Sequence, residues 1–97
     1  MYARVARWEG AEAEVIRRTA SMISSEAQSG PPPGVPAKGF TLLIDPDGGR
    51  VLAVALFETE EDLKTGDAAL SAMSPPEEGM GRRVSVEMYE VAVELRA

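Results

Sequence analysis

The stretch Val51-Leu52-Ala53-Val54-Ala55-Leu56-Phe57 contains seven apolar residues and no polar one. Turn-forming residues precede it and a helix-capping residue, Thr59, follows it, so the run has the length of a strand. A strand with one face in water alternates apolar and polar side chains. The unbroken run therefore predicts a strand that is covered on both faces.

The residues before this stretch predict a hairpin. Residues 40–44 form a short apolar strand, and residues 45–49, Asp-Pro-Asp-Gly-Gly, supply the proline and glycines of a tight turn. Asp45 and Asp47 are expected to serve the turn itself. Residues 50–57 then return as the second strand of the hairpin.

A helix is predicted directly after the stretch. Thr59 can cap its amide hydrogens, and Asp62 stands at the reciprocal position of a capping box. Gly66 weakens a helix by up to about 1 kcal/mol relative to alanine, which predicts a bend or close packing there. The prolines at 75–76 end the helix. Its apolar seam comprises Leu63, Leu70 and Met73.

The remaining elements lie toward the two ends of the chain. Residues 1–9 predict a strand, and residues 11–28 predict an amphipathic helix. Residues 29–38 contain four prolines and form a stiff connector. Residues 82–96 predict a long last strand whose apolar positions change phase beyond Tyr89, as expected for a strand in two different surroundings.

The order β-α-β-β-α-β is that of the ferredoxin-like fold, an α+β architecture. It predicts one domain over residues 1–97, with a four-stranded antiparallel sheet and two helices on one face. Residues 51–57 then form a central strand whose second face the helices cannot cover. A second copy of the chain is the expected cover, which makes the protein a homodimer.

Composition excludes several classes of function. The net charge of −6 argues against nucleic acid as a partner, because phosphate binding needs a basic surface. No membrane span or signal peptide is visible, so a cytoplasmic location is expected. The sequence has no cysteine and no histidine, which argues against thiol catalysis, disulfides and the common metal and triad sites.

The chain resembles the dimeric α/β-barrel superfamily, particularly its small antibiotic-biosynthesis-monooxygenase-like domains. The resemblance covers nearly all of the chain. It rests on the strand at 2–8, the connector Pro-Gly-Val-Pro-Ala-Lys-Gly-Phe at 33–40, the turn at 45–49, the junction Phe-Glu-Thr-Glu-Glu-Asp at 57–62 and Tyr-Glu-Val at 89–91. It implies a cofactor-independent oxygenase or a relative without an assigned activity.

Catalytic members of that superfamily hold aromatic substrates with Asn, Trp, Tyr, Arg or His side chains, and this chain contains neither Asn nor His. The resemblance, together with the aromatic and arginine residues of the chain, predicts a candidate pocket between the sheet and the helices. Its expected lining is Tyr2, Arg4, Trp8, Phe57 and Tyr89. The expected ligand is a small organic molecule, bound without metal or cofactor.

Two interpretations of the strand arginines remain open. Arg4 and Arg7 either pair with Glu87 and Glu90 of the neighbouring last strand, or Arg4 grips a ligand beside the aromatic residues. The first favours a non-catalytic dimeric ligand-binding or interaction module, and the second favours a monooxygenase-like protein. The acidic groups Glu60-Glu61-Asp62 and Glu77-Glu78 are expected to be capping or solvated residues and not metal ligands.

Overall fold

The structure is a computed structural model, and it describes residues 1–72 and 81–95. The six elements follow in the predicted order. They are β1 (Tyr2–Glu9), α1 (Ala13–Ala27), β2 (Gly39–Asp45), β3 (Arg50–Phe57), α2 (Glu60–Ala72) and β4 (Arg82–Glu90). Met73, Glu77, Glu78 and Arg96, which the sequence analysis named, lie outside the described residues.

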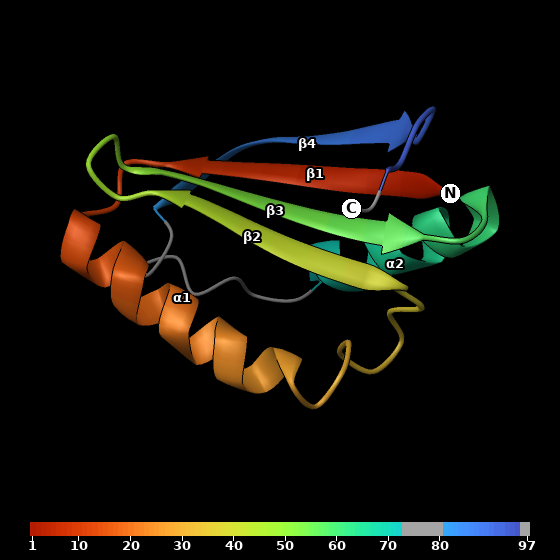
Figure 1. Cartoon of the computed structure of the whole chain (residues 1–97), viewed down its shortest axis with the longest axis horizontal. Coiled ribbons are helices and arrows are strands. Elements are labelled where there is room, and N and C mark those ends of the chain that lie inside the picture. Colours follow the sequence, from red (N-terminus) through yellow and green to blue (C-terminus); the bar gives the residue numbers. More distant parts are fainter. Residues whose placement is uncertain (73–80, 96–97) are drawn as a thin grey trace.

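The strands form one antiparallel sheet in the order β2-β3-β1-β4, which confirms the predicted ferredoxin-like fold. The two central strands are β1 and β3, as the apolar run required. Both helices lie on the same side of the sheet, with α1 alongside β2 and α2 beneath the opposite end of the strands (Figure 1). None of the described helices is both long and apolar enough to cross a bilayer.

Strand register decides which side chains face the helices. Residues directly opposite one another on paired strands share a face. Tyr2, Arg4, Ala6 and Trp8 of β1 stand opposite Phe57, Ala55, Ala53 and Val51 of β3, and this set faces the helices. The other set, with Ala3 and Val5 opposite Leu56 and Val54, faces away from them.

The core on the helix side consists of two clusters. The first joins Ala6, Trp8 and Val51 of the sheet to Ile16 of α1. The second joins Ala55 and Phe57 of the sheet to Leu63 of α2 and Val35 of the proline-rich connector. Each helix therefore has its own contact region on one continuous sheet face.

Close packing at Gly66 fixes the position of α2. A Cβ at this position would lie 2.5 Å from Cζ of the Phe57 ring and would also overlap Cε1. The absence of a side chain lets the helix approach the ring directly. This confirms the close packing that the sequence predicted. The predicted cap is present too, because Thr59 Oγ1 accepts a hydrogen bond from the Asp62 amide at 3.0 Å.

The last strand is shorter than the sequence predicted. Strand β4 ends at Glu90, and residues 91–95 form no strand, so the prediction of a strand to residue 96 was wrong. The reason is the neighbouring strand: Glu90 pairs with Tyr2, the first residue of β1, and the Val91 amide then donates to the Met1 carbonyl at 2.9 Å. A register shift occurs earlier, between Arg7 and Trp8, and leaves Val84 as the bulged residue.

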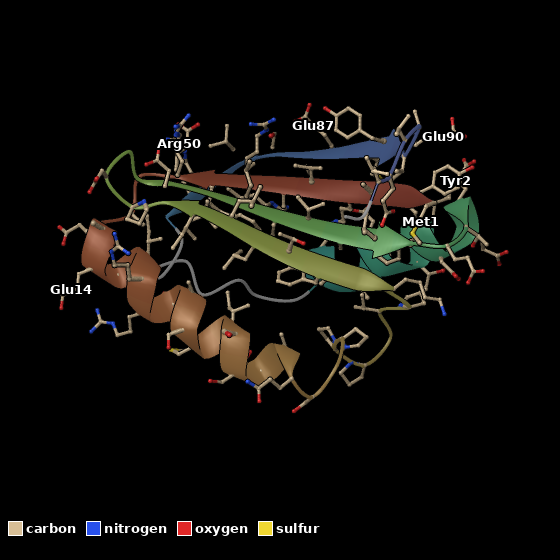
Figure 2. All side chains as sticks on the ribbon, viewed as in Figure 1. Met1, Tyr2, Glu14, Arg50, Glu87 and Glu90 are labelled. Carbon is tan, nitrogen blue, oxygen red and sulfur yellow. The ribbon has the colours of Figure 1, made fainter. Side chains whose placement is uncertain are left out.

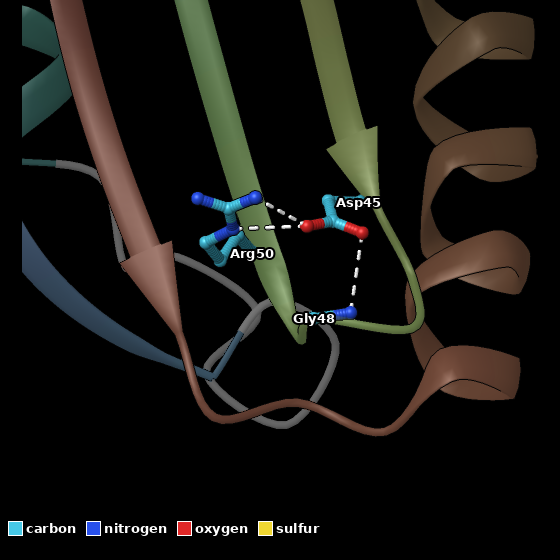
Figure 3. Close-up of polar contacts among 3 residues, drawn as sticks. All are labelled: Asp45, Gly48 and Arg50. Atoms are coloured by element: carbon cyan, nitrogen blue, oxygen red, sulfur yellow. Dashed lines mark hydrogen bonds and ion pairs between the residues drawn. The ribbon is translucent and has the colours of Figure 1, made fainter.

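Asp45 closes the hairpin between β2 and β3 (Figure 3). Its carboxylate accepts a hydrogen bond from the Gly48 amide at 3.1 Å and two from the Arg50 guanidinium, at 2.9 and 2.6 Å. The hydrogen bond from Arg50, followed by that from Gly48, lowers the pKa of Asp45. Asp45 therefore serves the turn, as predicted.

Candidate functional site

An open groove of about 300 Å³ lies between α1 and β2 on the helix side of the sheet. We call it the α1/β2 groove. Its described lining is Ala20, Ile23, Ser24, Ala27, Phe40, Leu42 and Ile44. Six of these side chains are apolar, and Ser24 contributes the one hydroxyl group of the described lining. A space of this size and composition can hold a small organic molecule with few polar groups.

The groove follows from the amphipathic pattern of α1 and from the edge position of β2. The residues at 20, 23, 24 and 27 recur at helical spacing and therefore lie on one face of α1. Phe40, Leu42 and Ile44 alternate along β2 and share its helix face. Phe40 and Ile44 are exposed although they are large and apolar. The helix thus approaches β2 without filling the space above it.

Arg4 is held inside the molecule by α2. Its guanidinium donates through Nε to Asp67 Oδ1 at 2.8 Å and through Nη2 to Ser71 Oγ at 3.4 Å. Only 6% of Arg4 is exposed, and 29% of the Asp67 side chain is. The sequence left open whether Arg4 pairs with Glu87 or Glu90. Its partner is instead Asp67, because the Arg4 side chain faces the helices.

Three further predicted site residues share that face of the sheet but lie in different places. Trp8 belongs to the core cluster beside α1, and Phe57, which is fully buried, belongs to the cluster beside α2. Tyr2 is partly buried and packs against the Phe57 cluster. Trp8 also carries a buried indole nitrogen, Nε1, that has no hydrogen-bond partner among the described residues.

Tyr89 lies on the opposite face of the sheet from the other four predicted residues, since it pairs with Ala3. Its hydroxyl donates to Glu87 Oε2 at 2.7 Å, while Arg7 Nε donates to Glu87 Oε1 at 3.0 Å. The hydrogen bond from Tyr89, followed by that from Arg7, lowers the pKa of Glu87, and the same hydrogen bond raises the pKa of Tyr89. Of the alternatives that the sequence left open, Arg7 therefore follows the pairing with a carboxylate of the last strand, Glu87.

The five predicted residues are therefore not gathered around one space. Tyr2, Arg4, Trp8 and Phe57 face the helices from two core regions, and Tyr89 faces away. None of them belongs to the described lining of the α1/β2 groove. That they bind a ligand stays a prediction. Among the described residues, no cluster of acidic side chains is suited to hold a metal ion.

Sequence reasoning missed the groove because it identified an amphipathic helix at 11–28 and an apolar strand at 40–44 without the space between them. A signal was present in three small residues of α1: Ala20, Ser24 and Ala27 lie opposite an edge strand that carries large apolar side chains. Small side chains on the helix leave space there. Periodicity identifies the buried face of a helix, but it does not measure how fully that face is covered.

The face of the sheet that the helices leave uncovered is apolar in the middle and polar at its margins. Val54 and its neighbours on β3 are partly buried, and Leu43 of β2 is half exposed. Arg50 and Glu87 project on this side, away from α1 and α2 (Figure 2). Arg50 forms an ion pair with Asp45, and Glu87 forms an ion pair with Arg7. These charges at the margins of the face are therefore neutralised by their neighbours.

Comparisons with known proteins identify a solved structure with a similar fold. No family model matches the chain, and no curated protein matches it. Among solved structures, a protein from Deinococcus radiodurans that is proposed to be an antibiotic biosynthesis monooxygenase has a similar structure, with a TM-score of 0.56. The similarity covers 100% of this chain and 98% of the other, at 13% sequence identity.

This similarity supports the ferredoxin-like fold of the monooxygenase-like domains that the sequence resembled. At 13% identity it describes architecture and not chemistry, since one fold hosts many unrelated functions. The function must therefore be argued from the α1/β2 groove and the side chains around it.

Proposed function

We propose that this protein binds a small, largely apolar organic molecule in the α1/β2 groove. The observation that carries the proposal is the groove itself, with about 300 Å³ of space and six apolar side chains in its described lining. Burial of an apolar molecule against these side chains releases water from both surfaces and supplies the driving force.

The described lining also limits the kind of molecule. Ser24 is its one polar side chain, and no described lining residue carries a charge. A charged group buried there would lose its hydration without gaining an ion-pair partner, which is costly. The preferred molecule is therefore uncharged and has at most a few polar atoms.

Binding is tested by titrating the protein with small bicyclic molecules such as 1-tetralone and following fluorescence of Trp8, the single tryptophan of the chain. We expect saturable binding that Ala20→Phe weakens at least about tenfold, because the ring fills the groove. Ser21→Phe is the matched control: it places the same ring on the neighbouring, exposed position of α1 and leaves affinity unchanged. Equal effects of the two substitutions, or no saturable binding, would contradict the proposal.

Oxygenation of the bound molecule is a second candidate, supported by the description of the Deinococcus radiodurans neighbour. Oxygenation without a cofactor requires the substrate to donate electrons to dioxygen, which is easiest after a base has removed a proton. The described groove offers only the Ser24 hydroxyl, and Arg4 is bound to Asp67 and Ser71. Binding without reaction is therefore the better supported function, in accord with the non-catalytic alternative that the sequence left open.

Measurement of dioxygen uptake with an oxygen electrode distinguishes binding alone from oxygenation. Protein incubated with a bound, oxidisable ligand such as 1-tetralol or a naphthol is expected to consume no dioxygen above the rate of the ligand alone. Protein-dependent oxygen uptake that Ala20→Phe abolishes and Ser21→Phe preserves would establish oxygenation in place of simple binding.

The uncovered face of the sheet is proposed to bind a second copy of the chain. Its apolar middle would lose contact with water, and its ion pairs Arg7–Glu87 and Arg50–Asp45 would enter the interface already neutralised. Val93 and Leu95, which are 85% and 91% exposed, add apolar surface that a partner would cover. A two-fold arrangement satisfies both copies with the same patch.

Light scattering at micromolar concentration tests this assembly. We expect a dimer for the unaltered chain and a monomer for Val54→Asp, which places a charge in the middle of the face. Arg17→Asp, on the exposed side of α1, is the control and should remain dimeric. A monomeric unaltered chain would refute the proposed assembly without affecting ligand binding in the groove.

A further inference from the structure

The indole of Trp8 contains a hydrogen-bond donor that the described protein does not use. Its Nε1 atom is buried, and it has no acceptor among the described residues. The residue as a whole is 8% exposed, so water reaches it poorly. Buried donors without an acceptor are rare in proteins, because the donor has lost its hydrogen bonds to water. Such a group is explained when a bound molecule supplies the acceptor.

The surroundings of Trp8 are apolar and extend to the α1/β2 groove. Its buried neighbours in the cluster are Ala6, Ile16 and Val51, none of which carries a side-chain acceptor. Ile23 and Leu42 pack against the same cluster and also line the groove. Ile23 and Leu42 therefore connect the cluster that contains the indole to the groove, and both side chains are only partly buried.

We infer that the molecule bound in the α1/β2 groove is a neutral carbonyl compound, whose oxygen accepts a hydrogen bond from Trp8 Nε1. This inference rests on the proposed function and specifies the chemical class of its ligand. For the oxygen to reach the indole, Ile23 or Leu42, which join the groove to the cluster, must rotate. A neutral acceptor suits the site, because a neutral indole donor and apolar walls cannot compensate a buried negative charge.

A matched pair of molecules isolates the carbonyl group. 1-Tetralone and tetralin share the same bicyclic skeleton and differ by one carbonyl oxygen. Because the chain has a single tryptophan, a nitrogen-labelled sample gives one indole N–H resonance in its proton–nitrogen NMR spectrum. We expect 1-tetralone to shift this proton resonance downfield, as a new hydrogen bond does, and tetralin to leave it without a downfield shift.

Replacement of the indole nitrogen provides the energetic test. Biosynthetic substitution of Trp8 by benzothienylalanine keeps the bicyclic shape and removes the donor. We expect the affinity of 1-tetralone relative to tetralin to fall about tenfold in the substituted protein, the usual effect of losing one buried hydrogen bond. Because the affinity of 1-tetralone is divided by that of tetralin in each protein, the different hydration of the two molecules and any general change in packing cancel.

The outcomes separate this inference from the proposed function. If both molecules bind, if Ala20→Phe displaces both, and if the indole resonance and the affinity ratio are unaffected, the groove binds ligands but Trp8 does not contact them, and the inference is wrong. If neither molecule binds to the unaltered protein, the proposed function fails and the inference fails with it.

Discussion

The two helices cover the same face of one sheet in different ways. On the α2 side, Gly66 brings the helix against the ring of Phe57, and Arg4 is fixed by Asp67 and Ser71. On the α1 side, small residues of the helix stand over large side chains of β2, and a groove of about 300 Å³ remains. One side is therefore closely packed and the other has room for a ligand.

Close packing stabilises the α2 side of the sheet, whereas the α1 side retains space. Interiors are close-packed, and adding atoms to a tight contact lowers stability, as creating a cavity does. Substitutions that add atoms should therefore destabilise the α2 side and be tolerated on the α1 side. Gly66→Ala tests the α2 side of this difference, and the further substitutions compare other paired regions of the molecule.

The largest effect is expected for Gly66→Ala. Gly→Ala within a helix normally stabilises it by up to about 1 kcal/mol. Here the new methyl group would overlap the Phe57 ring, so we expect the free energy of unfolding in urea to fall by about 2–3 kcal/mol. Phe57→Leu in the same chain makes room, and the double variant should lose less than the sum of the two losses. A stabilising Gly66→Ala would refute the close packing of α2.

Asp67→Ala should have the next largest effect. It leaves the buried Arg4 guanidinium without its carboxylate, and we expect a loss of about 2 kcal/mol, because Asp67 itself is partly exposed. Glu60→Ala provides the control, since its ion pair with Lys64 is exposed and should change stability by less than about 0.5 kcal/mol. Equal losses in the two variants would mean that the ion pair with Asp67 does not hold Arg4 against α2, and that Arg4 is free to bind a ligand.

The helix N-termini give a smaller contrast. Thr59 caps α2, whereas Glu12 precedes α1 without a side-chain capping bond. Thr59→Ala should lower the free energy of unfolding by about 1 kcal/mol. Glu12→Ser should leave it unchanged or raise it by a few tenths of a kcal/mol. Urea denaturation of both variants measures the difference, and a loss in Glu12→Ser as large as that in Thr59→Ala would contradict it.

The sequence pattern was sufficient to predict the sheet and the order of the helices and strands. The run at 51–57 identified a central strand, and the capping residue Thr59 marked the start of α2. Gly66 was also informative, because a glycine inside a helix requires a reason such as the contact with Phe57. These features are local in sequence or repeat with a fixed period, so they can be recognised without coordinates.

The candidate site was harder to predict, because it depends on contacts between distant segments. The pairing of Arg4 with Asp67 joins residues on β1 and α2, and the sequence offered Glu87 and Glu90 as equally reasonable partners. Tyr89 was assigned to the wrong side of the sheet, since its face depends on the register of β4 with β1. The end of β4 at Glu90 likewise depends on where its neighbour begins.

The smallest predicted effect lies on the face that neither helix covers, and it measures how strongly an exposed polar cluster contributes. Hydrogen bonds from Tyr89 and Arg7 lower the pKa of Glu87 in the folded chain from its ordinary value near 4.5. A carboxyl group with a lowered folded pKa contributes stability above its unfolded pKa, and the contribution disappears as the pH falls through the folded pKa.

We therefore expect the stability advantage of the unaltered chain over Glu87→Gln to be present at pH 6 and to vanish toward pH 2–3, as measured by urea denaturation across this range. Tyr89→Phe should remove the larger part of the pH dependence, because the Tyr89 hydrogen bond is its principal cause. Glu14→Gln, on the exposed side of α1 (Figure 2), removes an equal charge and is the control. A pH dependence that is the same in Glu87→Gln and Glu14→Gln would show that the Arg7–Glu87–Tyr89 cluster adds nothing specific.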